Sequence, residues 1–486
     1  MLKQYVKKYK NLPVQVKASI WFLISSFLQK SISALTTPIF TRLLSSAEFG
    51  QFNVFLSWQS ILRVIITLNL FYGVYTAGLV KFEERRSEFV SSLEGLTLTL
   101  VCTWGLIYIC LKDIINDLLS LNTPQMLSMI ITFWTTAVFS FWAAEQRVNY
   151  KYKTLVIITL GVSLAKPIAG IISVLVFPDK VTARIISLAV IELACFTWMF
   201  FSHIKRCPAL FSSFFWKYAL RFNIPLIPHY LAQNILNNSD RIMIKRMVSD
   251  NAAGIYSLAY SVALIMNLFN TALTQTMGPW VYERIKQRKE EEIKTVAIPS
   301  IAIIACVNLL LIAFAPEIIR IFAPPSYYEA IWTIPPVVMS VYFTYLYNVF
   351  SYFEFYYEKT TFIAIATMLS ALANVILNYA FIGLFGYIAA GYTTLICFIL
   401  YAVGHFLVMQ KISQKYMNGK QLFPIKDLIF ITISFMAVGF IFCALYPYPK
   451  VRYCALIALF AGLLLNKKFF KNSINQLLNI RKKGEQ

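Results

Sequence analysis

Residues 42–52 read RLLSSAEFGQF, and residues 246–256 read RMVSDNAAGIY, so one pattern occurs twice, 204 residues apart. Each copy joins two apolar stretches of the chain. Four positions carry the same or a similar residue in both copies: Arg42 and Arg246, Ser45 and Ser249, Gly50 and Gly254, and Phe52 and Tyr256. The recurrence predicts a chain built from two similar halves.

The composition predicts that these halves lie in a membrane. Of the 486 residues, 58% are hydrophobic and 14% are charged, and the mean hydropathy is +0.64. Soluble domains carry about 25% charged residues, so a soluble enzyme is excluded, and so is a disordered chain. The stretches are also too long for outer-membrane barrel strands of about 10 residues. About fourteen stretches approach the roughly 20 apolar residues that span a bilayer: 16–38, 52–78, 90–111, 124–144, 154–177, 184–202, 222–247, 254–279, 295–315, 330–353, 361–383, 387–409, 427–446 and 451–466.

Six of these spans fit within one repeat. An even number leaves the two copies parallel, related by a pseudo-two-fold axis along the membrane normal, which is a layout of two-lobed transporters. We therefore expect an all-α polytopic membrane protein with an N-terminal lobe at 1–203 (spans 1–6) and a C-terminal lobe at 204–412 (spans 7–12). Residues 413–486 would add two spans and a basic cytoplasmic tail.

The charges indicate the orientation. The chain has 44 Lys and Arg against 22 Asp and Glu, a net charge of +22. Most basic residues fall in loops on one side of the predicted spans, as in 81–89, 203–217, 283–294 and 411–426. By the positive-inside rule this side is cytoplasmic, and so are both termini. The charge is then a topology signal that also favours anionic lipid headgroups, and no nucleic-acid partner is expected. We expect a multi-pass membrane protein.

Four cations lie inside predicted spans: Lys30, Arg63, Lys166 and Arg241. Each costs about 2.5–3.5 kcal/mol to insert near the bilayer centre. One interpretation is that they face a substrate, since Lys and Arg pair well with phosphate oxygens. The alternative is that they pair with buried carboxylates and carbonyls and hold helices together.

Uncharged polar residues accompany these cations. The first span contains Gln29, and the seventh contains His229, Gln233, Asn234 and Asn237. Such side chains can hydrogen-bond sugar hydroxyls, and they can equally connect neighbouring helices. Asp240, beside Arg241, is a candidate for ion coupling.

No catalytic constellation is present in the sequence. The three His lie on separate elements, and neither H-x-x-x-H, G-x-S-x-G nor a phosphate-binding G-x-x-x-x-G-K-[ST] motif occurs. The eight Cys form no C-x-x-C pair, so neither a metal site nor a disulfide framework is expected. We expect no catalytic residue and no cofactor. A proton or sodium gradient, or removal of the substrate, would drive any transport.

Two segments resemble a known family. PIFTRLLSSAEFGQF at 38–52 and NIPLIPHYLAQNILNNSDRIMIKRMVSDNAAGIYSLAYSVA at 223–263 resemble segments of bacterial polysaccharide-unit flippases. These are the Wzx-type flippases of capsule and O-antigen pathways, in the multidrug/oligosaccharidyl-lipid/polysaccharide exporter superfamily. The resemblance implies a MATE-like fold of two six-helix bundles around a central cavity, with two added helices. By depth and span, the family's cationic cavity residues correspond to Lys30, Arg63, Lys166 and Arg241.

The resemblance also implies a cargo. It would be an undecaprenyl-pyrophosphate-linked oligosaccharide, moved by alternating access out of the cytoplasmic leaflet of the bacterial cytoplasmic (inner) membrane. Membrane lipids, a polysaccharide polymerase and other assembly proteins are the expected partners of a monomeric protein. A cation or drug antiporter of the same fold would instead need carboxylates in its cavity. Flippases of lipid-linked peptidoglycan precursors share the fold but fit the two segments less well. A membrane polymerase or acyltransferase would need the long loop that this sequence lacks.

Overall fold

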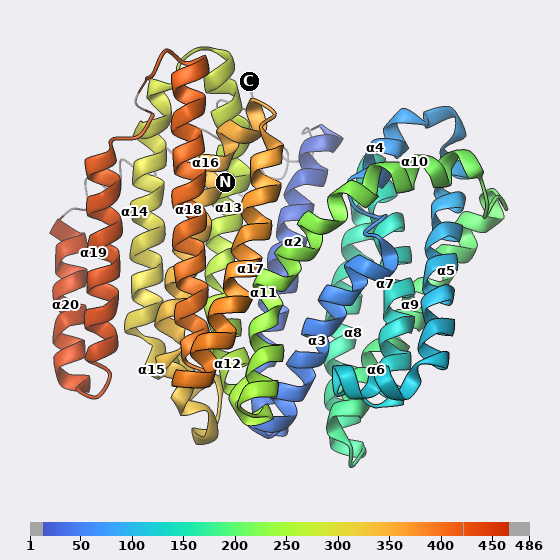
Figure 1. The fold of residues 1–486 in the computed structure, drawn as a ribbon, viewed down its shortest axis with the longest axis horizontal. Coiled ribbons are helices and arrows are strands. Elements are labelled where there is room, and N and C mark those ends of the chain that lie inside the picture. Colours follow the sequence, from blue (N-terminus) through green and yellow to red (C-terminus); the bar gives the residue numbers. More distant parts are fainter. Residues whose placement is uncertain (1–12, 421, 466–486) are drawn as a thin grey trace, which may run out of the picture. The chain divides into compact units, whose positions relative to one another are not determined.

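The computed structural model describes residues 13–420 and 422–465, and every regular element within them is a helix (Figure 1). The chain divides into two compact units between Asn238 and Ser239, inside helix α11 (Ile227–Met247). We call them the first unit and the second unit. The basic residues before position 13 and the basic tail after position 465 lie outside the described residues.

The first unit is built from long helices joined by short connections. Its elements are α2 (Val14–Leu43), α3 (Ser46–Thr67), α4 (Val74–Lys81), η1 (Glu83–Arg85), α5 (Arg86–Cys110), α6 (Lys112–Leu119), α7 (Thr123–Val148), α8 (Tyr152–Val176), α9 (Lys180–Arg206), α10 (Ser213–Asn223), η2 (Ile224–Leu226) and the first part of α11.

The second unit begins within α11 and has the same general plan. Its further elements are α12 (Asp250–Ala263), α13 (Met266–Lys286), α14 (Glu291–Ala313), α15 (Ala315–Phe322), η3 (Pro325–Trp332), α16 (Ile334–Tyr356), α17 (Thr360–Phe385), α18 (Ala389–Tyr416), α19 (Ile425–Ala444) and α20 (Pro449–Leu465).

A helix lies over each of the fourteen predicted stretches, but the count of fourteen spans is not confirmed. Ten helices are long and apolar enough to cross a membrane, and the bent pair η3 and α16 makes up to eleven. Helices α3, α11 and α20 are not among them. Helix α20 has 17 described residues, and α11 carries many amide and charged side chains.

The repeated sequence pattern has a structural counterpart at two helix starts. Ser45 caps α3, because its hydroxyl accepts a hydrogen bond from Glu48 N at 3.2 Å and the Glu48 carboxylate accepts one from Ser45 N at 2.7 Å. Ser249 caps α12 by accepting from Ala252 N at 3.1 Å. These bonds satisfy backbone N–H groups that a helix start leaves without partners. The repeated serine therefore has the same role in both units.

The order of elements also repeats. The third long helix of each unit, α5 and α14, is followed directly by a helix of eight residues, α6 and α15. The second predicted span of each half is interrupted, between α3 and α4 and between α12 and α13. In the first unit the buried Asn223 amide holds this break by donating to Leu68 O at 2.9 Å and Asn69 O at 3.0 Å. Helix α7 packs on α9 as α16 packs on α18.

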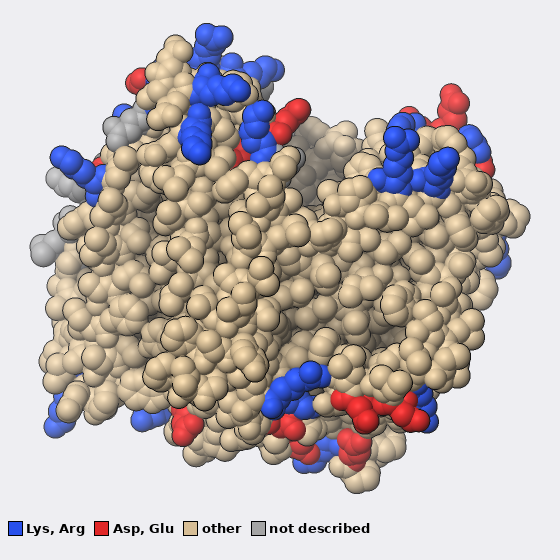
Figure 2. All heavy atoms as spheres, viewed as in Figure 1, with Lys and Arg blue, Asp and Glu red and all other residues tan. Residues whose placement is uncertain are grey.

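The surface of both units suits a lipid environment. Large apolar side chains are exposed along the helices, for example Leu35 at 73%, Ile157 at 70% and Leu384 at 74%. On the face shown in Figure 2, charged side chains lie near the helix ends, and the band between them is almost free of charge. In water such surfaces would associate, so we assign the uncharged band to the bilayer.

Candidate functional site

The first unit contains a polar cavity of about 320 Å³ between α2, α3, α7, α8 and α9. The apolar part of its wall includes Phe40, Phe52 and Phe55. Its polar lining consists of Gln29, Ser33, Thr36, Gln59, Thr132, Ser163, Lys166, Arg184 and Glu192. Two of the residues predicted from the sequence, Gln29 and Lys166, are thus brought together here.

Lys166 is held in the cavity wall by a carboxylate. Its Nζ lies 2.6 Å from Glu192 Oε1, and the other Glu192 oxygen accepts hydrogen bonds from Thr135 at 2.7 Å and Thr136 at 3.0 Å. The Lys166 side chain is 29% exposed and that of Glu192 is 9% exposed. An ammonium has three N–H donors, and Glu192 accepts one. Lys166 therefore keeps the capacity to donate to an anion in the cavity.

Arg184 is a cavity cation that the sequence analysis missed. Its guanidinium carbon lies 3.5 Å from the ring centroids of both Phe40 and Phe52. Stacking between two aromatic faces fixes the guanidinium plane, and a guanidinium binds carboxylates or phosphates through the N–H groups at its edge. Arg184 lies one turn inside α9, at the first residue of the predicted span 184–202. It was therefore not counted among the cations inside the spans. The aromatic Phe52 in the repeated pattern was the available clue.

Two amides complete the polar wall. Gln29 donates to Ser163 Oγ at 3.2 Å, which connects α2 to α8. Gln59 donates to Thr132 Oγ1 at 2.7 Å, which connects α3 to α7. Both side chains hold helices together, and both line the cavity. The two interpretations of such polar residues are therefore compatible.

Lys30 and Arg63 do not line this cavity. Lys30 is exposed on α2. Arg63 is half-buried on α3, one turn beyond Gln59, and is electrostatically attracted by Glu192. Its Nε has no hydrogen-bond partner among the described residues. Glu192 therefore attracts two of the predicted in-span cations, Lys166 directly and Arg63 from further away. The role of Lys30 and Arg63 stays a prediction.

The polar residues of α11 bond mostly within their own helix. Asn234 donates to Tyr230 O at 2.9 Å, and Asn237 donates to Gln233 O at 2.8 Å. These bonds use side-chain donors locally and leave the side-chain carbonyl oxygens for other partners. His229 is half-buried, and its Nδ1 has no hydrogen-bond partner in the described chain. A substrate role for these polar residues of α11 also stays a prediction.

Asp240 is the centre of a buried oxygen-rich cluster in the second unit. It is 1% exposed. One carboxylate oxygen accepts from Asn378 at 2.6 Å, and the other accepts from Tyr256 at 2.5 Å and Thr394 at 3.0 Å. Its neighbour Arg241 points elsewhere and stacks on Tyr260, with 4.2 Å from the guanidinium carbon to the ring centroid. The Arg241 guanidinium therefore stacks on an aromatic ring and also acts electrostatically on Asp240.

Two asparagines missed by the sequence analysis extend this cluster. Asn374 donates to Thr394 at 3.1 Å and accepts from Asn378 at 3.2 Å, and Thr393 donates to Asn378. Carboxylate, amide and hydroxyl groups from α11, α17 and α18 thus form one buried hydrogen-bonded network, in which Asn378 and Thr394 donate to Asp240. Hard cations prefer oxygen ligands of this kind. The signal in the sequence was the spacing of four between Asn374 and Asn378, on one face of an apolar helix.

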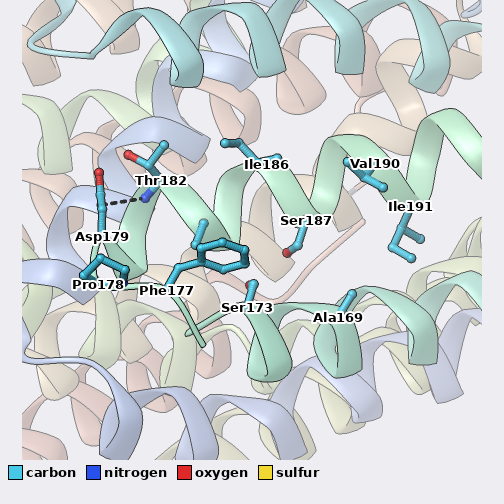
Figure 3. A pocket seen from close by; sticks show the side chains of 11 residues that line it. Ala169, Ser173, Phe177, Pro178, Asp179, Thr182, Ile186, Ser187, Val190 and Ile191 are labelled. Carbon is cyan, nitrogen blue, oxygen red and sulfur yellow. Dashed lines mark hydrogen bonds between the residues drawn. The ribbon is translucent and has the colours of Figure 1, made fainter. Parts of the chain in front are cut away.

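An apolar groove lies on another face of α8 and α9. It has a volume of about 420 Å³, and it shares no lining residue with the polar cavity. Figure 3 shows Phe177, Ile186 and Val190 along it, with Asp179 capping α9 through Thr182 N at 3.0 Å. The three apolar side chains are 40–57% exposed, so the groove opens toward the lipid and suits an acyl or prenyl chain.

Solved structures share this fold. The inward closed conformation of the lipid II flippase MurJ matches with a TM-score of 0.70 and 15% identity, covering 94% of this chain and 100% of that chain. An inward-facing multidrug resistance MATE transporter of the MOP superfamily matches with a TM-score of 0.64 and 14% identity, covering 79% and 95%. The fold is therefore MATE-like, as the family resemblance implied.

Sequence comparison narrows the class. The family model described as polysaccharide biosynthesis protein matches residues 16–284, more than half of the chain, and the model described as MatE matches residues 225–380. The chain belongs to the polysaccharide biosynthesis protein family. Protein 1 of the Lsg locus of Haemophilus influenzae is 23% identical over 390 residues, covering 74% of this chain and 89% of that protein.

Proposed function

We propose that this protein is a flippase for an undecaprenyl-pyrophosphate-linked oligosaccharide in the bacterial cytoplasmic membrane. It would move this substrate from the cytoplasmic to the outer leaflet by alternating access. The family membership supports a role in polysaccharide assembly, and the fold supports membrane transport. The observation that carries the substrate class is the cavity of the first unit, where Lys166 and Arg184 stand among amides and hydroxyls.

The chemistry of the cavity suits both parts of such a headgroup. Arg184 presents a planar set of donors to phosphate oxygens, and Lys166 adds a compact charge. Gln29, Gln59 and Ser163 offer donors and acceptors for sugar hydroxyls. Because Glu192 already neutralises Lys166, the cavity can close around the ion pair when no substrate is bound. The prenyl tail would remain in lipid, outside the unit.

We assign ion coupling to the Asp240 cluster of the second unit. Asp240, Asn378 and Thr394 each carry a side-chain oxygen, the ligand that a small hard cation prefers, and a cation would replace the Asn378 N–H that now faces Asp240. Sodium is the cation we favour, and protonation of Asp240 is the alternative. A drug or cation antiporter would place carboxylates where its cationic substrate binds. In the first-unit cavity, however, the only carboxylate among the lining residues, Glu192, is already paired with Lys166.

The substrate assignment is tested by export from the cell that makes the glycan. After deletion of the gene, the cell is complemented with K166A, R184A or the control K151A, which removes an exposed Lys between α7 and α8. Losing a charge-assisted hydrogen bond costs about 1.5–3 kcal/mol, which is about tenfold or more in affinity. We expect K166A and R184A to lose surface polysaccharide and accumulate lipid-linked oligosaccharide on the inner leaflet, while K151A exports normally. Normal export by both cavity variants would contradict the assignment.

If the deleted strain instead accumulates lipid-linked peptidoglycan precursor, the substrate is the one named for the structural neighbour MurJ. If neither lipid accumulates and the cell becomes sensitive to cationic drugs, the antiporter alternative holds. Extraction of the membrane lipids followed by mass spectrometry distinguishes these outcomes.

A further inference from the structure

His203, near the end of α9, lies between two carboxylates. Its Nδ1 is 2.5 Å from Glu94 Oε1 on α5, and its Nε2 is 3.1 Å from Glu145 Oε2 on α7. The side chains of His203 and Glu94 are fully buried, and that of Glu145 is 8% exposed. Three titratable groups from three helices are therefore joined in series inside the first unit.

Hydrogen bonds between His203 and both carboxylates require one more proton than a neutral imidazole and two ionised carboxylates carry. A neutral imidazole has one N–H, and its other ring nitrogen is an acceptor. Both ring nitrogens face carboxylate oxygens, which are acceptors when ionised. Two hydrogen bonds form only if one further proton is present, on the ring or on a carboxyl group. The geometry is therefore that of a site with a bound proton.

The series has an outer end, which faces solvent, and an inner end, which is buried within the unit. At the outer end Arg206, whose side chain is 46% exposed, binds both oxygens of Glu145 at 2.6 and 3.1 Å. At the inner end the second oxygen of Glu94 is buried without a hydrogen-bond partner in the described chain. The nearby Tyr75 hydroxyl on α4 is buried and also lacks such a partner. Arg86 on α5 is the further charged group near these side chains.

The second unit has a simpler pair at the corresponding place. His405 Nδ1 on α18 lies 2.7 Å from Glu354 Oε1 on α16, and both side chains are fully buried. His405 Nε2 has no hydrogen-bond partner among the described residues and faces no second carboxylate within hydrogen-bonding distance there. The helices involved, α16 and α18, correspond in order to α7 and α9. The second unit therefore provides a natural comparison in which one acid is missing.

We propose that Glu145, His203 and Glu94 form a proton-binding relay in the first unit, entered from the end that the positive-inside rule assigns to the cytoplasm. In the unloaded state His203 carries its proton on Nδ1, and both carboxyl groups are ionised. A proton that reaches Glu145 passes to Nε2 while the Nδ1 proton passes to Glu94. One proton is gained, one O–H bond forms on Glu94, and Glu145 is ionised again. Proton binding then changes the charge among α5, α7 and α9 and alters the transport rate.

The relay is tested on the full chain by NMR of ¹⁵N-labelled histidine, because the protein contains three His and H203Q identifies the signal of His203. Spectra are taken from about pH 5 to pH 9, a range that includes the pH values at which histidine side chains usually change protonation. We expect the His203 signals to shift over this range in the native chain, and the shift to disappear in E94Q and E145Q. The control E354Q leaves the His203 shift in place. His203 signals that do not change with pH in the native chain, or that change equally in E94Q, overturn the relay.

A second measurement separates a proton relay from a merely structural cluster. Polysaccharide export by complemented cells is followed as the external pH and, with it, the cytoplasmic pH are varied. We expect the pH profile to flatten in H203Q and to keep its shape in E354Q. A lowered export with an unchanged profile in H203Q would show a structural role and overturn the proposal. Gel filtration of each variant confirms that the compared proteins are folded.

Discussion

Asp240 is the residue whose substitution tests ion coupling. D240N keeps the side-chain volume and removes the charge around which Tyr256, Asn378 and Thr394 donate. A ligand at 100 times its Kd stabilises a protein by about 2.7 kcal/mol, so we expect sodium chloride to raise the Tm of the native protein above its value in choline chloride. D240N should lose this rise. The control D179N changes an exposed acid that caps α9, where Asn caps equally well, and it should keep the rise.

A Tm that ignores sodium but rises with acid in the native protein, and not in D240N, would make the proton the coupling ion. No response to either ion would contradict a coupling role.

The sequence indicated Asp240 and Lys166 as candidate residues because a charge in an apolar span is costly. It did not indicate Asn374 or Asn378, because a neutral amide lacks the insertion cost of a charge. It did not indicate Arg184 either, because that residue lies at the end of a predicted span. Contacts between side chains on different helices, such as that of Lys166 with Glu192, leave no periodic pattern in the sequence from which they could be predicted.

At the scale of elements, the repeated serines make a testable pair. Replacing a helix-capping serine by alanine costs about 1 kcal/mol. The Ser45 hydroxyl makes two bonds, accepting from Glu48 N and donating to the Glu48 carboxylate, whereas the Ser249 hydroxyl accepts a single bond. We expect S45A to lower the Tm of the purified protein more than S249A does. Ser212 precedes α10 without a side-chain capping bond, so S212A should leave the Tm unchanged. Equal Tm values for S45A and S212A would contradict the capping role.

Helices were predictable wherever apolar residues run on for the length of a bilayer. The breaks between α3 and α4 and between α12 and α13 were not, because the surrounding residues remain apolar across them. The first break depends on Asn223, more than 150 residues away in the chain. Helix α11 was predicted as a span although its polar residues place it outside the ten apolar helices. The sequence analysis had counted it among the apolar stretches, at 222–247.

At the scale of the whole molecule, the repeat and the loop charges together predict which helix ends share a side of the membrane. Ser120, in the turn before α7, and Lys450, in the first turn of α20, follow odd-numbered predicted spans. Lys151, between α7 and α8, and Lys415, near the end of α18, follow even-numbered spans. All four side chains are exposed. If the N-terminus is cytoplasmic, the first two positions are outside and the last two are inside.

Single cysteines at these positions test that arrangement. The eight native Cys are free thiols, so they are first replaced, and the resulting chain must still export polysaccharide. A membrane-impermeant maleimide should label S120C and K450C in intact cells, and it should label K151C and K415C only after the membrane is permeabilised. Because each pair has one position in each unit, the result also tests whether an even number of crossings separates the two members of a pair. An odd number of predicted spans lies between Ser120 and Lys415. Labelling of S120C and K415C from the same side would mean that the number of crossings between them is even. The parallel repeat would then be wrong even if each unit is folded as described.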